Sequence, residues 1–364
     1  MNTRDVGDAL LEKAISIEHN FPKRQQAMVI GVDTYGPGFN RLDNAVSDAR
    51  AISEVLAAEY GFELIPSGTA ILDHQASFEA ICPIVESSLR SADSTMRWLF
   101  FFAGHGIMVD REGYLLPTNA IIGRLDTYLP LQWLLKRSLD SDCGEVLIIL
   151  DACYGGRALV RYDQLSDYIP KEGFTDRIRQ LVTSGNPDQP VLDGGADNHS
   201  IFTQTLLDAL QGWAGIHESD GSVRFSKLLD HVVFEVPSRL RNQGISTARQ
   251  QPIGGNLIGN RLKRDFVFHC TVPRLPPEIV RGTRSDDQER RRQDLARLTE
   301  TCKQASQLTP LAVKIAKLHL LTEPMVGSAT LITSTLRYEP AIEVRAEAAH
   351  LLGMLGEPAA INAL

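Results

Sequence analysis

The sequence lacks the marks of membrane-spanning and disulfide-rich proteins. No apolar run in its 364 residues is long enough to span a bilayer. Residues 1–24 carry acidic side chains where a signal peptide has an apolar stretch. The 5 cysteines are odd in number and have no CxxC spacing, which argues against a disulfide framework and against a zinc site. We therefore expect a cytoplasmic protein with reduced thiols, no bound metal and no cofactor.

Positive charge is also scarce. The chain has 37 lysines and arginines against 45 acidic residues, which gives a formal net charge of -8. Nucleic acid is therefore not an expected partner, and neither is a membrane. Hydrophobic residues make up 43% and charged residues 23%, an ordinary balance for a folded chain with a sizeable core. The length favours two domains over one.

What the sequence does contain is an alternation of apolar strands and amphipathic helices. This alternation predicts an α/β fold with a mostly parallel sheet covered by helices on both faces. In such sheets, binding and catalysis occur at the carboxyl ends of the strands. The expected strands are 27–32, 69–72, 97–103, 145–150 and 179–183, with a short excursion at 113–117 and a closing strand at 266–269. The expected helices are 5–18, 42–60, 77–89, 128–139, 200–210 and 225–240.

Two glycine-flanked residues follow two of these strands. His105 lies in Gly104-His-Gly106 and Cys153 lies in Asp151-Ala-Cys-Tyr-Gly-Gly156. An imidazole beside a thiol takes up its proton and later protonates the leaving amine. The backbone N–H groups of Cys153 and Gly106 are candidate donors to the oxyanion. A lone cysteine is more often a buried apolar residue, and a lone histidine beside glycine is more often a loop residue. Together at two strand ends, they favour a catalytic pair.

Phe101-Phe-Ala-Gly-His-Gly106 and Asp151-Ala-Cys-Tyr-Gly-Gly156 resemble the two active-site signatures of the caspase and metacaspase peptidases. The resemblance covers roughly residues 26–269. It implies a caspase-like fold and a cysteine endopeptidase that hydrolyses peptide bonds through a thioester. Supporting segments are 27–32, 42–49, 198–203 and 250–252.

The resemblance also indicates a substrate-binding pocket. Asp151 stands two residues before Cys153, where metacaspases have Asp and caspases usually have Gln. Asp48 looks like the second acid of the metacaspase pocket. Two carboxylates in a desolvated pocket would bind Arg or Lys and repel Asp. Alternatively, Asp48 is a solvated helix residue and Asp151 is satisfied by backbone N–H groups. The calcium-binding cluster of many metacaspases has no counterpart in 108–113, so we expect no calcium site.

The remaining cysteines and histidines have no assigned role. Cys82, Cys143 and Cys270 lie in apolar contexts and are expected in the core. Sequence reasoning identifies no partner for His74, His199 or His231.

The C-terminal part of the chain differs in character. Residues 344–364 resemble a HEAT repeat, with an ordinary helical hairpin as the alternative, and we expect more repeats beyond Leu364. The expected domains are therefore an extension at 1–25, a peptidase domain at 26–270, a charged linker at 271–307 and HEAT-like repeats at 308–364.

We expect the activity to be latent. Either a regulatory protein binds the repeats, or the enzyme cleaves itself after basic residues that follow Cys153. By analogy, such a protein belongs to bacterial immunity or regulated cell death. A non-enzymatic scaffold and a hydrolase of another acyl substrate are the competing functions. The candidate self-cleavage residues are Arg157, Arg161, Lys171, Arg177 and Arg179.

Overall fold

The computed structural model describes residues 24–152, 177–185, 199–212, 214–218, 220–242, 250–257 and 264–271. The chain divides into two compact units, and the larger one consists of Pro22–Leu207 and Arg224–Val267. It contains the central sheet and the residues of the candidate site. The N-terminal helix, the linker and the HEAT-like repeats expected from the sequence lie outside the described residues.

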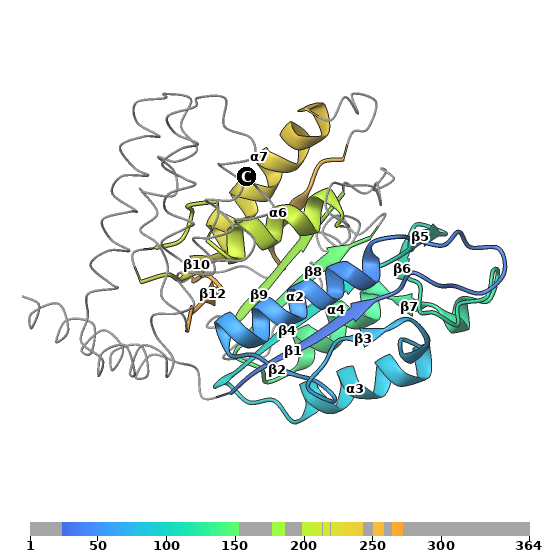
Figure 1. Ribbon diagram of the computed structural model, residues 1–364. Helices are drawn as coiled ribbons and strands as arrows, with labels where there is room; N and C mark the ends of the chain where they lie inside the picture. The colour runs from blue at the N-terminus through green and yellow to red at the C-terminus, as the bar shows by residue number, and fades with distance from the viewer. Residues whose placement is uncertain are drawn as a thin grey trace, which may run out of the picture. The chain divides into compact units, whose positions relative to one another are not determined.

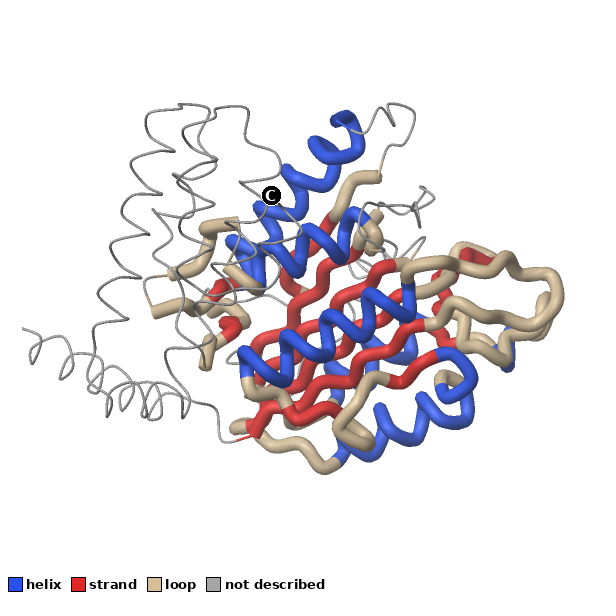
Figure 2. The backbone as a smooth tube through the Cα atoms, viewed as in Figure 1, coloured by secondary structure: helices blue, strands red, loops and turns tan. Residues whose placement is uncertain are grey.

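A seven-stranded sheet forms the centre of the larger unit (Figures 1 and 2). Its order is β11-β9-β8-β4-β1-β2, and β3 also pairs with β1. All of its pairings are parallel except that of β11 with β9. The sequence predicts this mostly parallel sheet correctly. The strands are β1 (Arg24–Gly31), β2 (Glu63–Leu64), β3 (Ile71–Leu72), β4 (Met96–Ala103), β8 (Glu145–Asp151), β9 (Ile178–Thr183) and β11 (Ile253–Asn256).

The described helices follow the predicted amphipathic segments; α7 begins at Phe225 as predicted, and the others begin slightly later than predicted. Helix α2 begins at Ala45 rather than Leu42, and it ends as predicted at Gly61, which has a left-handed φ of 66°. Helix α3 begins after Ser77, whose side chain accepts a hydrogen bond from the Ala80 N–H. None of the described helices has the length and apolar character needed to cross a membrane. The helices are α2 (Ala45–Tyr60), α3 (Phe78–Arg90), α4 (Leu131–Asp140), α6 (Ile201–Leu210) and α7 (Phe225–Asn242), with 3₁₀ turns at Asp73–Gln75 and Leu125–Thr127.

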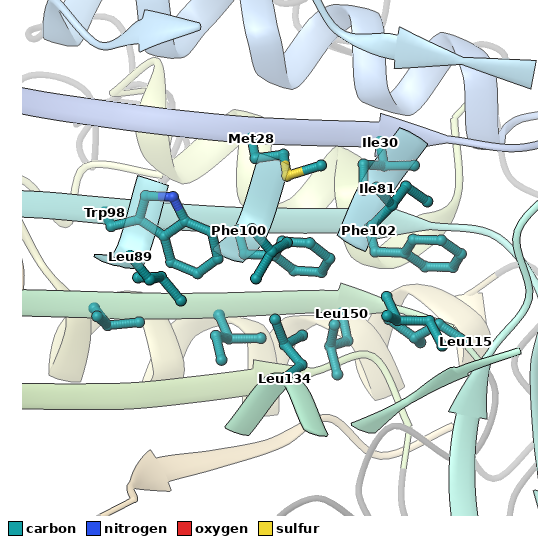
Figure 3. Packing of buried hydrophobic residues seen from close by; sticks show 14 of the residues in the cluster. Met28, Ile30, Ile81, Leu89, Trp98, Phe100, Phe102, Leu115, Leu134 and Leu150 are labelled. Carbon is teal, nitrogen blue, oxygen red and sulfur yellow. The ribbon is translucent and has the colours of Figure 1, made fainter. Parts of the chain in front are cut away.

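The two faces of the sheet are covered by different helices. Along β4, Trp98, Phe100 and Phe102 are fully buried in one apolar cluster with side chains of α3 and α4 (Figure 3). Strand residues alternate between faces, so the residues between them point to the opposite side. There, α2 lies so close to β1 that a Cβ added at Gly31 would lie 2.4 Å from the Ala45 carbonyl oxygen. This close approach fixes α2, which carries Asp48, against the sheet.

Two smaller sheets accompany the central one. A three-stranded sheet has the order β5-β6-β7, and it contains the excursion that the sequence places at the sheet edge. The expected closing strand at 266–269 is wrong as a member of the central sheet. Strand β12 pairs with β10 instead, and the antiparallel strand β11 occupies the edge beside β9. These strands are β5 (Gly106–Val109), β6 (Glu112–Leu115), β7 (Leu129–Pro130), β10 (Val223–Arg224) and β12 (Val267–Phe268).

Two buried arginines stabilise the amino-terminal end of the sheet. Arg97 donates hydrogen bonds to Glu145 Oε2 (2.7 Å) and to Gln25 Oε1 (3.1 Å). Arg179 donates to the carbonyl oxygens of Ser138 (2.7 Å) and Cys143 (2.7 Å), at the end of α4 and the loop that follows it. Arg179 is 1% exposed within β9, so the expectation that it is a self-cleavage site is wrong.

Candidate active site

The site begins where three parallel strands end in register. Gly31 of β1, Ala103 of β4 and Asp151 of β8 are Cα partners across the sheet. The Gly104 N–H donates to the Asp151 carbonyl oxygen at 3.1 Å, which extends this pairing one residue past β4. The segments that leave the sheet here therefore start from one edge.

His105 and Cys153 follow this edge at matching positions. His105 is two residues beyond Ala103, and Cys153 is two residues beyond its register partner Asp151. Cys153 itself lies outside the described residues. The 48 residues that separate His105 from Cys153 equal the separation of Ala103 from Asp151, so the two segments start from paired strand residues.

The His105 imidazole is fixed by a backbone carbonyl. Its Nε2 lies 2.8 Å from the carbonyl oxygen of Asn40, in the segment that follows β1. A carbonyl oxygen only accepts, so Nε2 must carry a proton in this contact. In the neutral ring, Nδ1 then keeps its lone pair and is the atom able to take a proton from a thiol.

Aromatic residues hold His105 from the side. The Tyr35 hydroxyl accepts a hydrogen bond from the His105 backbone N–H at 2.7 Å. The Tyr35 ring centroid lies 4.8 Å from that of the imidazole, and Phe39 adds a second ring contact at 6.5 Å. Gly104 makes room for this arrangement, because a Cβ there would lie 2.6 Å from the Tyr35 hydroxyl oxygen.

The backbone N–H of Gly106 is not used in the pairing of β5 with β6. The Leu116 N–H donates to the His105 carbonyl oxygen at 2.9 Å, and Gly106 is paired with Leu115 in the antiparallel β5–β6 ladder. Hydrogen-bonded and non-hydrogen-bonded pairs alternate in such a ladder. The Gly106 N–H therefore points away from β6, toward the side of β5 where the described part of the chain contributes no strand. A donor in that position suits an oxyanion.

Asp48 is buried and paired with a histidine. It is 1% exposed, so the alternative that it is a solvated helix residue is wrong. Its Oδ1 lies 2.7 Å from His199 Nδ1, and the Ser200 N–H is 3.3 Å from each carboxylate oxygen. Burial raises the pKa of Asp48 to about 7, with a smaller upward contribution from the charge of Asp151, while His199 acts in the opposite direction.

Asp151 is held by hydroxyl groups at the start of α6. Its Oδ2 accepts hydrogen bonds from Ser200 Oγ and from Thr203 Oγ1, the latter at 2.7 Å. In these two contacts the partners of Asp151 are side-chain hydroxyls. Ser200 contacts both acids, because its N–H faces Asp48 while its hydroxyl faces Asp151. The structure thus brings Asp48 and Asp151 into one buried cluster.

Sequence reasoning missed several residues of this site. The lack of a partner for His199 is corrected by its contact with Asp48. Asn40 contributes through its backbone, which no side-chain motif reveals. The resemblance of segment 198–203 to caspases and metacaspases is the sequence signal for His199, Ser200 and Thr203. The missed residues are Tyr35, Asn40, His199, Ser200 and Thr203.

Two of the described thiols, those of Cys143 and Cys82, are poor nucleophiles. Burial raises the pKa of Cys143 and of Cys82 to about 11 in each case. Cys143 and Cys270 are buried as predicted, whereas Cys82 is only half-buried. A thiol with a raised pKa is protonated at neutral pH and reacts slowly. Within the described ranges, no group of three or more His, Cys, Asp or Glu residues is arranged to hold a metal ion.

A mostly parallel sheet with flanking helices and a glycine-flanked histidine at its carboxyl edge fits a caspase-like fold. The chain belongs to the caspase domain family, because the family model for the caspase domain of peptidase C14 matches residues 24–254. This membership supports a cysteine-type peptidase. No curated protein matches the chain. Among solved structures, the chain is similar to a protein from Geobacter sulfurreducens, with 14% sequence identity and a TM-score of 0.46 over 64% of this chain and 93% of the other.

Proposed function

We propose that this protein is a cysteine endopeptidase that cleaves after arginine or lysine, with Cys153 as nucleophile and His105 as general base. The observation that carries the proposal is the buried acid pair of Asp48 and Asp151. It lies at the strand edge from which the segments of His105 and Cys153 depart. Family membership supports the reaction class, and the acids support the specificity.

The reaction follows from the residues around His105. Its Nδ1 takes the thiol proton of Cys153, and the thiolate attacks the scissile carbonyl carbon. The Gly106 N–H stabilises the oxyanion that forms. The proton then passes from Nδ1 to the leaving amine as the C–N bond breaks, which leaves a thioester. Water, deprotonated by the same nitrogen, hydrolyses the thioester and restores the thiol.

The specificity follows from the charge of the pocket. A guanidinium or ammonium group would interact favourably with two carboxylates in a desolvated site. An aspartate side chain would be repelled by the same groups. The hydroxyls of Ser200 and Thr203 can rotate, so Asp151 can exchange one of these contacts for a substrate donor without the loss of a backbone hydrogen bond.

The test is cleavage of three fluorogenic peptides that end in Arg, Lys or Asp, by the wild type and by Cys153→Ala. We expect the wild type to cleave the Arg and Lys peptides, and the variant to retain less than about one-thousandth of that rate. An irreversible inhibitor with an arginyl chloromethyl ketone should label Cys153 in the wild type, as read by mass spectrometry. A preference for Asp would refute the pocket. Absence of both cleavage and labelling, in the full chain and in a version that ends near His269, would favour the scaffold hypothesis.

Regulation remains a prediction from the sequence. The HEAT-like repeats at 308–364, the regulatory partner expected to bind them and the linker lie outside the described residues, as do Arg157, Arg161 and Lys171. A comparison of the full chain with a version that ends near His269 tests the control model. Equal peptidase activity without self-cleavage in either version would contradict it. A role in bacterial immunity or regulated cell death and a cytoplasmic location are likewise predictions from the sequence.

A further inference from the structure

The acid pair has a basic neighbour of its own. His199 Nδ1 lies 2.7 Å from Asp48 Oδ1, which is ion-pair distance when the imidazole is protonated. The His199 side chain is 19% exposed, whereas that of Asp48 is 2% exposed. His199 can therefore exchange protons with solvent, while Asp48 sits behind it.

The charges around Asp48 come from two other elements. Asp151, at the end of β8, acts on it as a like charge, and His199, just before α6, acts as an opposite charge. Ser200 and Thr203 contribute only neutral donors to this cluster. The net charge of the cluster therefore changes with the protons that Asp48, Asp151 and His199 hold.

We infer that His199 is a specificity-determining residue, an internal counter-ion that competes with the basic side chain of the substrate for Asp48. The inference rests on the proposed function, because it assigns His199 a part in the same pocket. A protonated imidazole at Asp48 cancels one of the two negative charges that would attract arginine. A neutral imidazole leaves both charges in place.

The sign of the pH dependence follows. Protons that the cluster gains as the pH falls reduce its negative charge, and a proton on His199 would mask Asp48 directly. The pKa of Asp48, raised to about 7 mainly by burial, works in the same direction because a protonated carboxyl attracts no cation. The preference for arginine over a neutral residue of the same shape should therefore rise with pH through the neutral range.

The decisive variant is His199→Asn. An asparagine side chain places an N–H donor close to the position of Nδ1 but takes up no proton, so it keeps the hydrogen bond to Asp48 and removes the positive charge. The probe is a pair of peptides that end in arginine or in its neutral isostere citrulline, cleaved from about pH 5.5 to about pH 8. We expect His199→Asn to raise the Arg-to-citrulline ratio of kcat/KM by about tenfold at the acidic end, with little change at the alkaline end.

The exposed His74, replaced by Asn, is the matched control and should leave the ratio unchanged at every pH. If His199 only supports the start of α6, His199→Asn will follow the wild-type profile, and that result overturns the inference while the peptidase stands. His199→Leu removes the donor as well, and a lower arginine preference in that variant confirms that the hydrogen bond also matters.

A binding experiment that needs no catalysis tests this inference separately from the proposed peptidase activity. Calorimetry of Cys153→Ala with N-acetyl-arginine amide and N-acetyl-citrulline amide needs no turnover. If binding is selective for the arginine amide and His199→Asn strengthens it in acid, the inference holds even where cleavage is absent. If the two amides bind equally, or neither binds, both the inference and the basic specificity fail.

Discussion

Buried charged groups gather at both ends of the central sheet, but their partners differ. At the amino-terminal end, Arg179 donates mainly to backbone carbonyl oxygens, which are fixed by the strands and turns that carry them. At the carboxyl end, Asp48 and Asp151 accept mainly from side chains of residues 199–203, which can rotate or change protonation. The comparison separates Arg179, whose backbone contacts stabilise the fold, from the acid pair, whose side-chain contacts can be exchanged for a ligand.

The largest expected effect lies at the amino-terminal end. Arg179→Met leaves several buried carbonyl oxygens without a donor, so we expect the free energy of unfolding to fall by about 3–5 kcal/mol. Urea unfolding measures it. Arg177→Met is the matched control, because Arg177 is more exposed and its ion-pair partner Asp142 lies largely in solvent. If Arg179→Met unfolds like the wild type yet loses peptidase specificity, the conclusion that Arg179 stabilises the fold rather than the site is wrong.

At the carboxyl end of the sheet, we expect the variant Asp48→Asn to gain stability relative to the wild type as the pH rises. The folded pKa of Asp48 is raised from 3.8 to about 7, so the wild type loses stability as the pH rises between these values, where the unfolded carboxyl ionises before the folded one. Asp48→Asn removes this ionisation. We expect the variant to become more stable than the wild type by about 2 kcal/mol as the pH rises from about 4 to above 7, less than the full shift implies because the His199 contact is also altered. Urea unfolding of both proteins at several pH values measures the gap, and a gap that narrows with rising pH would contradict the assignment.

Asp151→Asn tests the specificity directly. It removes one charge from the pocket while it keeps the size of the side chain. We expect kcat/KM for arginine peptides to fall by more than about tenfold relative to citrulline peptides, the size typical of a hydrogen bond to a charged group. Thermal melting serves as the control for folding. Equal losses for both peptides would show that Asp151 supports the structure and not the specificity.

The smallest effect is expected from Thr203→Val, which has nearly the same shape and lacks the hydroxyl that donates to Asp151 at 2.7 Å. Loss of one of two hydroxyl donors should lower the arginine preference by about fivefold, equivalent to about 1 kcal/mol. Thr205→Val is the control, because the Thr205 hydroxyl donates to the Ile201 carbonyl within α6. A larger loss in the control would show that α6 tolerates no such change.

The sequence predicted the central sheet well, because apolar strands and amphipathic helices follow from local periodicity. It misplaced the last strand. Short strands such as β11 and β12 depend on pairing partners that are distant in the sequence. At the site, Asp48 and Asp151 were identified from motif resemblance. The Asn40 carbonyl was not identifiable, because backbone contacts carry no residue signature. His199 was missed because its partner lies 151 residues away.

The pairing of Ala103 with Asp151 has a consequence for variation within the family. The pairing of β4 with β8 sets the distance in space between the points where the segments of His105 and Cys153 leave the sheet. The length of the connection between the two strands does not set it. The three-stranded sheet and α4, which form that connection, can therefore gain or lose residues while the starting points of the two segments stay where they are. A relative with a different number of residues between its histidine and cysteine is expected to keep the same strand register. Alignments of such relatives should be anchored on the two strands and left free to gap between them.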